Sequence, residues 1–212
     1  MNAMILAAGR GERLRPYTDS CPKPLLEVRG RPLIEYHLKA LAAAGFDRVV
    51  INLSWLGEMI HEKLGDGSQY GVRIDYSPEP EALETAGGIV QALPHLDECF
   101  VVINSDIFTD YPFERLSNID STAHLVLVEN PVHNSQGDFT LEHGLVGNAE
   151  QGRYTFAGIA AYQKSFFEGL SQGKQALAPM LRKAAENKQL GGELYTGSWT
   201  DVGTLERWQS LG

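Results

Sequence analysis

Cysteine and long apolar runs are both scarce in this sequence. The only two cysteines are Cys21 and Cys99, which make neither a disulfide framework nor a metal cluster. No apolar run approaches the ~18 residues that a membrane helix needs. The first positive charge, Arg10, follows the apolar start of the chain, which is the wrong order for a secretory signal. We therefore expect a reduced, cytoplasmic protein that does not bind membranes.

Basic charge is also in short supply. The chain carries 18 Lys and Arg against 27 Asp and Glu, a net charge of −9. Nucleic-acid binding depends on clustered basic residues, so this balance argues against a nucleic-acid partner. Residues 10–23 reverse the local sign, with Arg10, Arg13, Arg15 and Lys23 against Glu12 and Asp19. Small anionic ligands respond to such local charge and remain candidates as partners.

The apolar pattern predicts an α/β protein. Strands are expected at residues 3–7, 48–52, 72–76 and 100–104, each separated from the next by a helical segment. Such alternation is typical of a parallel sheet with helices on both faces. The second half has further strands at 125–129, 139–141 and 154–162, and helices at 176–187 and 204–211. The prediction is one domain over residues 1–212, with a doubly wound, mostly parallel but mixed sheet.

A glycine turn follows the first strand, at Gly9 and Gly11. It lacks the third glycine of a dinucleotide-binding loop, because position 14 is Leu14, and Pro16 prevents a helix from running through the turn. Arginines and then Lys23 follow, and a proline on each side stiffens the backbone of the lysine. The segment suits a phosphate-bearing ligand. The alternative is a plain turn with solvated charges.

Three further segments are candidates for chemistry. Asp106 follows the most apolar strand, at the end where ligands bind in doubly wound sheets, and a carboxylate there suits Mg²⁺. Asp201 lies near the start of the last helix, where capping is the alternative role. Residues 79–88 run into a helix that Thr85 is expected to cap, and two glycines near its start suit a flat ligand against the backbone.

Taken together, these segments resemble the sugar-1-phosphate nucleotidyltransferases. The motifs are Leu6-Ala-Ala-Gly9-x-Gly11-x-Arg13-Leu-x-Pro16-x-Thr18, Pro22-Lys23-Pro24-Leu25, Glu84-Thr-Ala-Gly87, Asn104-x-Asp106 and Trp199-x-Asp201-x-Gly203-Thr204. The resemblance implies a Rossmann-like, glycosyltransferase-A-like fold. Within the family, the form of Glu84 to Gly88, of Gly137-Asp138-Phe139 and of residues 199–207 most resembles the uridylyltransferases that act on N-acetylmuramic acid 1-phosphate in cell-wall recycling.

The resemblance also implies roles for individual residues. Residues 1–110 would form a nucleotide-binding half and residues 111–212 a sugar-binding half. Arg13 and Lys23 would be catalytic, and Asp106 and Asp201 would bind Mg²⁺. The nucleotide would be bound by Ala8, Gly9, Arg10, Gly11, Lys23, Glu79, Thr85 and Gly87. The sugar phosphate would be bound by Asn104, Asp138, Gly158 and Glu193.

The expected reaction joins UTP and a sugar 1-phosphate, the two small-molecule partners, and releases pyrophosphate. No acid–base residue is expected to be essential, because the attacking phosphate is already ionised. The alternatives are guanylyl transfer to mannose 1-phosphate, thymidylyl or uridylyl transfer to glucose 1-phosphate, and a non-enzymatic nucleotide-sugar sensor. Nothing in the sequence chooses between Arg153 and His133 as the partner of a lactyl carboxylate, and the oligomeric state is left open.

Overall fold

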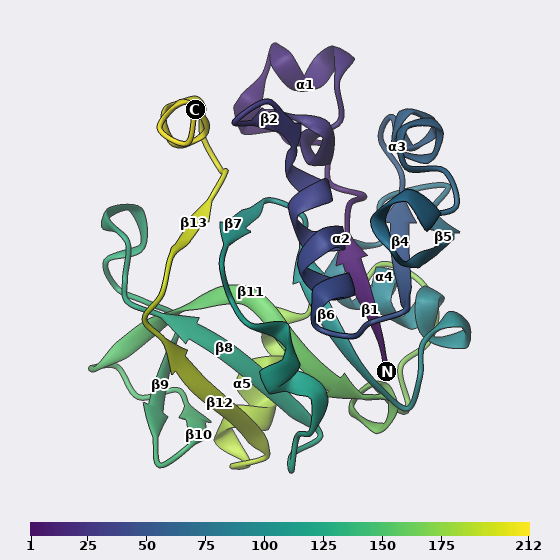
Figure 1. The fold of residues 1–212 in the computed structure, drawn as a ribbon. Helices are drawn as coiled ribbons and strands as arrows, with labels where there is room; N and C mark the ends of the chain where they lie inside the picture. The colour runs from purple at the N-terminus through teal and green to yellow at the C-terminus, as the bar shows by residue number, and fades with distance from the viewer.

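A computed structural model describes residues 1–212 and shows one large sheet with helices on both faces (Figure 1). Nine strands form this sheet in the order β5-β4-β1-β6-β11-β8-β12-β10-β9. Their bounds are β1 Asn2–Leu6, β4 Arg48–Leu53, β5 Arg73–Pro78, β6 Cys99–Asn104, β8 Ala123–Val128, β9 Phe139–Glu142, β10 Leu145–Gly147, β11 Arg153–Gln163 and β12 Leu190–Tyr195. Two small ribbons pair β2 Glu27–Val28 with β3 Arg31–Pro32, and β7 Ile107–Thr109 with β13 Trp199–Asp201.

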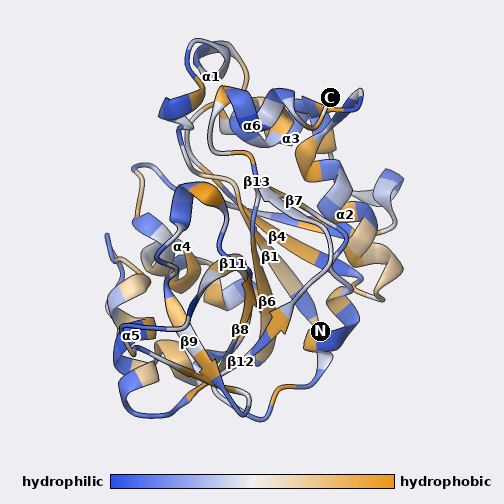
Figure 2. Cartoon of the chain, turned by 90° about the vertical axis from the view of Figure 1, so that its left-hand side faces the viewer, coloured by the Kyte–Doolittle hydropathy of each residue, from blue (hydrophilic) through white to orange (hydrophobic).

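Helices cover both faces of the sheet, and a layer of apolar core lies on each face. The helices are α1 Tyr17–Ser20, α2 Leu33–Ala43, α3 Gly57–Leu64, α4 Glu84–Ala92, α5 Ala178–Glu186 and α6 Leu205–Gln209. Alternate strand residues point to opposite faces; Ile5 packs with α2 and α3, whereas Met4 packs with α4 and α5. In Figure 2 the apolar strands lie between α4 and α5 on one side and α2 on the other. No helix has the length and apolar character needed to cross a membrane.

The strand directions bring the candidate segments to one edge. β5, β4, β1 and β6 are parallel, so the segments that follow them leave the sheet on the same side. β1 lies between β4, which follows it in the chain, and β6, which comes later, so the order of connection reverses beside β1. Such a reversal opens a crevice at the carboxyl ends of the strands. β11 then runs antiparallel to β6, and the predicted doubly wound, mixed sheet is confirmed.

Residues 9–30 are more ordered than a long loop. They fold into two 3-10 turns, η1 Glu12–Leu14 and η2 Lys23–Leu25, together with α1 and β2. The segment is held by the far end of the chain, because the Trp208 indole donates to Glu27 O at 2.7 Å and its ring packs edge-on against Tyr17. Arg29 Nε also donates to Leu211 O at 3.2 Å.

Some local predictions are wrong. Thr85 does not cap α4, because it lies inside the helix and the cap position is Leu83, with no side-chain hydrogen bond. The pattern missed β12, whose Leu190-Gly-Gly-Glu sequence has little β-branched character, although this strand lies inside the sheet between β8 and β10. Tertiary pairing decides its structure.

Candidate active site

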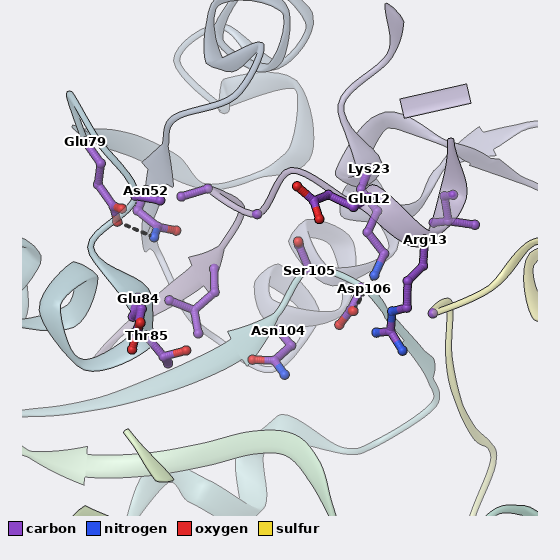
Figure 3. Close-up of a pocket in the computed structure, with 17 residues that line it drawn as sticks. Glu12, Arg13, Lys23, Asn52, Glu79, Glu84, Thr85, Asn104, Ser105 and Asp106 are labelled. Atoms are coloured by element: carbon purple, nitrogen blue, oxygen red, sulfur yellow. Dashed lines mark hydrogen bonds and ion pairs between the residues drawn. The ribbon is translucent and has the colours of Figure 1, made fainter. Parts of the chain in front are cut away.

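A cavity of about 470 Å³ opens where the parallel strands end. Figure 3 shows Arg13, Lys23 and Asp106 gathered at one side of the cavity. At the other side Glu84 and Thr85 lie below Glu79 and Asn52, and Asn104 lies between the two groups. Most residues predicted to bind the nucleotide or to act in catalysis line this cavity: Ala8, Gly9, Gly11, Arg13, Lys23, Glu79 and Thr85. Asn104, predicted to bind the sugar phosphate, and Asp106, predicted to bind the metal, line it too. The structure therefore brings four separate sequence segments into one space.

Gly11 fixes the shape of the glycine turn. Its φ is +69°, a conformation that favours glycine. A Cβ at this position would lie 3.0 Å from a Thr18 methyl carbon and 3.2 Å from Lys23 Cβ, so only glycine lets the turn fold back this closely. Thr18 Oγ1 donates to Gly11 O at 2.9 Å and secures the turn. The backbone of Gly9 is left open, with nothing within 4 Å of its Cβ position.

Lys23 and Asp106 form an ion pair with 2.5 Å between Nζ and Oδ2. Their side chains are 12% and 27% exposed, so the pair is largely sheltered but reaches the cavity. Arg13, on η1, adds a second cation at this side. Two cations beside a carboxylate at the end of a sheet can hold a polyphosphate and neutralise the charge that develops on it.

A buried network supports the opposite wall, and the sequence analysis missed its centre. Asn52, at the carboxyl end of β4, is 3% exposed. Its Nδ2 donates to Glu79 Oε1 at 2.7 Å, and its Oδ1 accepts from Ala7 N at 2.8 Å. Glu79 Oε2 accepts from Leu83 N at 3.0 Å. The available signal was a polar residue at the end of an apolar strand, the same signal that identified Asn104.

A second cavity of about 460 Å³ adjoins the first. The two share Leu6, Glu84, Thr85 and Asn104 as a common wall. Asp138 and Gly158, both predicted to bind the sugar phosphate, line the second cavity. Gly158 has φ +73°, and a Cβ there would lie 2.6 Å from Asn104 Nδ2, so this glycine leaves room for the Asn104 side chain.

Four predicted site residues line neither cavity. Arg10 stacks on Trp55, with its guanidinium carbon 4.3 Å from the ring centre. Gly87 is buried inside α4 against the backbone of Gly173. Glu193 accepts from Tyr111 Oη at 2.6 Å.

Asp201, the fourth, lies beside the first cavity rather than in its lining. Its strand pairs with β7, so that Val202 N donates to Asp106 O at 2.6 Å and Gly203 reaches the cavity. Its carboxylate pairs with Arg207 and with His133 Nε2, each at 2.9 Å. The structure contains no cluster of three or more metal-ligating side chains. Asp106 directly precedes β7, and Asp201 ends β13, the strand paired with β7. A donor set of two such carboxylates suits Mg²⁺ that completes its shell with phosphate oxygens and water.

His37 lies beneath the site and was not singled out in the sequence. Full burial lowers the pKa of this histidine to about 4, and the nearby Asp106 carboxylate only partly opposes the shift. Its Nε2 has no hydrogen-bond partner. A neutral ring is therefore packed behind the carboxylate-bearing segment.

Comparisons with known proteins agree with this geometry. An N-acetylmuramate alpha-1-phosphate uridylyltransferase from Neisseria meningitidis serogroup B (strain ATCC BAA-335 / MC58) is 50% identical over 219 residues, covering 98% of this chain and 95% of that protein. The mannose-1-phosphate guanylyltransferase catalytic subunit beta of Drosophila pseudoobscura pseudoobscura is 32% identical over 95% of this chain, which spans 58% of that relative.

Solved structures share the fold at low identity. HddC from Yersinia pseudotuberculosis superposes with a TM-score of 0.82 and 23% identity, over 99% of this chain and 97% of that one. The inositol-1-phosphate CTP transferase from T. maritima gives 0.79 and 19%, over 99% and 94%. A family model described as Nucleotidyl transferase matches residues 2–137, the part of the chain that holds the glycine turn, Lys23 and Asp106. This match, together with the 50% identity between the chain and its neisserial relative, shows that the chain belongs to the nucleotidyl transferase family.

Proposed function

We propose that the protein transfers a uridylyl group from UTP to N-acetylmuramic acid 1-phosphate, forming a UDP-sugar and pyrophosphate. The observation that carries this proposal is the continuity of the two cavities across Asn104 and Thr85. Two substrates, one in each cavity, would meet where the cavities join, near Asp106. The 50% identity to the neisserial uridylyltransferase supports the choice of base and sugar.

In this proposal the first cavity takes the nucleotide. The open backbone at Gly9 and Gly11 would face the phosphates, and the segment from Glu79 to Gly88, which includes the start of α4, would enclose the base. Glu79 is 5% exposed and held by two hydrogen bonds, so the wall that it supports would hold its polar groups in fixed positions for pairing with the base. The second cavity, between Asp138 and Gly158, would take the sugar. In this arrangement residues 1–110 supply nearly all of the nucleotide side and part of the sugar side, and residues 111–212 supply the rest of the sugar side.

In the proposed step, an oxygen of the sugar phosphate attacks the α-phosphorus of UTP. A new P–O bond forms as the bond to the β-phosphate oxygen breaks, and pyrophosphate leaves with its electron pair. Phosphoryl-type transfer depends on positioning and charge neutralisation more than on a covalent partner. Lys23 would neutralise charge at the α-phosphate, and Arg13 charge on the departing pyrophosphate.

We further propose that Asp106 and Asp201 hold one Mg²⁺. The bound ion would supply additional neutralisation between the two phosphate-bearing substrates. In the structure both carboxylates are already paired, Asp106 with Lys23 and Asp201 with Arg207. N-Acetylmuramic acid is a cell-wall sugar, so we place the reaction in peptidoglycan recycling in the cytoplasm.

A pyrophosphate-release assay over a matrix of substrates tests this function. UTP, GTP and dTTP are each combined with the 1-phosphates of N-acetylmuramic acid, N-acetylglucosamine, mannose and glucose. UTP is expected to exceed GTP by well over a hundredfold in kcat/KM, because a pocket that pairs with a base's polar groups discriminates by up to about 10⁴. If GTP with mannose 1-phosphate is the best pair, the proposed function is wrong. Absence of turnover with every pair would instead favour a nucleotide-sugar sensor.

A further inference from the structure

One cation in the second cavity, Arg182, has no role in the proposed transfer step. Among its lining residues, Glu84 and Asp138 are acidic, and Arg182 is the only basic one. N-Acetylmuramic acid differs from N-acetylglucosamine by a lactyl ether, which adds a methyl group and a carboxylate. A carboxylate entering this cavity meets two acidic side chains, so binding it there requires a cation on the same surface.

The two basic residues named from the sequence are engaged elsewhere. Arg153 Nε donates to Ala149 O at 2.6 Å, and its terminal nitrogen donates to Asn148 O at 3.1 Å. His133 pairs with Asp201 at 2.9 Å. Neither residue lines the second cavity. They support the loop at residues 148–149 and the β13 carboxylate respectively, and leave Arg182 as the cation available to a ligand.

Arg182 is held in place without being neutralised. It lies on α5, where its carbonyl oxygen accepts from Asn148 Nδ2 at 2.7 Å. Its guanidinium carbon lies 5.5 Å from the ring centre of Phe139, the neighbour of Asp138 on the cavity wall. No carboxylate of the chain lies within ion-pair distance of it. Stacking on an aromatic face leaves the N–H edges free, and a planar guanidinium matches a carboxylate in two parallel hydrogen bonds.

The apolar part of the cavity suits the rest of the lactyl group. Leu177 and Leu181, on the segment leading into α5 and on α5 itself, line the cavity together with Phe139. Leu177 and Leu181 are close to Arg182 in the sequence, and Phe139 lies against its guanidinium. Together they offer an apolar surface for a methyl group. An apolar surface with a cation at its edge matches a methyl and a carboxylate carried on one carbon.

We propose that Arg182 binds the lactyl carboxylate of the sugar and thereby sets the preference for a muramic over a glucosamine sugar. This inference rests on the proposed function, because it names the group that distinguishes the proposed sugar from its neutral relatives. It makes Arg182 a specificity-determining residue that binds the substrate away from the reacting phosphates.

The test compares Arg182→Ala and Arg182→Lys with Lys183→Ala, which removes an exposed charge from the next position of α5 outside the cavity. The measured quantity is the ratio of kcat/KM for N-acetylmuramic acid 1-phosphate to that for N-acetylglucosamine 1-phosphate, with saturating UTP. Arg182→Ala is expected to lower this ratio by about 10- to 100-fold, mostly through KM, as the loss of a charge-assisted hydrogen-bond pair does. Arg182→Lys should lower it less, because an ammonium keeps the charge and loses the two-pronged geometry. Lys183→Ala should leave it within twofold.

The outcomes separate the inference from the function on which it rests. A wild-type enzyme that does not use N-acetylmuramic acid 1-phosphate overturns both. A wild-type enzyme that uses it, with a ratio unchanged in Arg182→Ala, overturns the role of Arg182 and leaves the function standing. Equal losses with both sugars also overturn it, because they indicate a structural effect; unfolding temperatures of the three variants, all at exposed positions, check that cause.

Discussion

Asn52 is the residue whose loss should damage stability and substrate binding together. It joins the end of β1, through Ala7 N, to the segment proposed to enclose the base, through Glu79. Asn52→Leu keeps the size of the side chain and removes both hydrogen bonds. It leaves a buried N–H and a buried carboxylate oxygen each without one partner, and each such group costs about 1–3 kcal/mol. With part of this offset by the apolar side chain, we expect unfolding to require about 2–4 kcal/mol less free energy.

The chain offers a matched control at the other end of the same sheet. Asn2 is 1% exposed and also makes two hydrogen bonds through its side chain, donating to His95 O and accepting from Asp97 N, each at 3.0 Å. It lies at the amino end of β1, away from both cavities. Asn2→Leu should leave substrate binding unchanged, and it should cost less free energy than Asn52→Leu, because His95 and Asp97 are exposed and water can replace the lost hydrogen bonds.

Thermal unfolding and steady-state kinetics measure the two effects. For a domain of this size, 1 kcal/mol corresponds to roughly 2–4 °C, so Asn52→Leu should unfold about 4–16 °C below wild type, and the shift in Asn2→Leu should be smaller. KM for UTP should rise at least about tenfold in Asn52→Leu, since about 1.4 kcal/mol of lost loop positioning has that effect, and stay within twofold in Asn2→Leu. Equal KM values in the two variants would refute the claim that Asn52 positions the nucleotide loop. A stability loss under about 0.5 kcal/mol in Asn52→Leu would refute the network itself.

Four other predictions follow from the site. Lys23→Ala should lower kcat by about 10²–10³ and leave the fold intact, as measured by initial rates and circular dichroism, and near-normal turnover would contradict the role of Lys23. Asp106→Asn and Asp201→Asn should each severely reduce activity, and the double variant should lose less activity than the sum of the two separate effects on the transition-state free energy. Chelator should abolish the activity of the wild type, and Mg²⁺ should restore it. Strictly additive losses would argue against a shared ion. Trp208→Ala should cost about 1–2 kcal/mol of stability and raise KM for UTP, because the indole holds Glu27 O and Tyr17 beside the glycine turn. Calorimetry measures the stability and steady-state kinetics the KM. An unchanged KM would contradict the claim that this contact supports nucleotide binding. His37 has a folded pKa of about 4 against an ordinary 6.5, so the unfolded state binds more protons between these values and stability falls as the pH is lowered. In denaturant titrations, His37→Phe should lose about 2 kcal/mol less stability than wild type between pH 8 and pH 5. Parallel stability curves for the two proteins would contradict the pKa shift.

The parallel half of the fold could be predicted because each of its strands carries its own signal. β1, β4 and β6 are continuous apolar runs, and only a sheet covered on both faces accommodates them. β12 carries no such signal, because its two glycines are selected by close packing: a Cβ on Gly191 would lie 2.6 Å from Ser121 Oγ. That constraint comes from a neighbouring segment some 70 residues away, which a local pattern does not contain.

The candidate site divides in the same way. Gly11, Lys23 and Asp106 were identifiable because a tight turn, a lysine between prolines and a carboxylate at a strand end are each visible within a few consecutive residues. Glu193 is predicted to bind the sugar; β12 places it outside the lining of the second cavity, where it accepts a hydrogen bond from Tyr111. Arg182 carries no motif at all. Its exposure to the second cavity depends on how α5 packs across β10 and β12, which only the assembled sheet determines.

The contact between residues 17–29 and residues 208–211 has a consequence for the order in which the chain becomes competent. The partners Glu27 and Trp208 are separated by 181 positions, and Arg29 and Leu211 by 182. A ribosome adding 5–20 residues per second needs roughly 10–40 s to cover that interval. During this time β1, α2 and β4 can already form, because their contacts are near in sequence, while residues 17–29 still lack their contact with residues 208–211. A chain cut near residue 200 would therefore keep every strand of the large sheet and still bind nucleotide poorly, because Trp208 and Leu211 would be missing from their contact with residues 17–29.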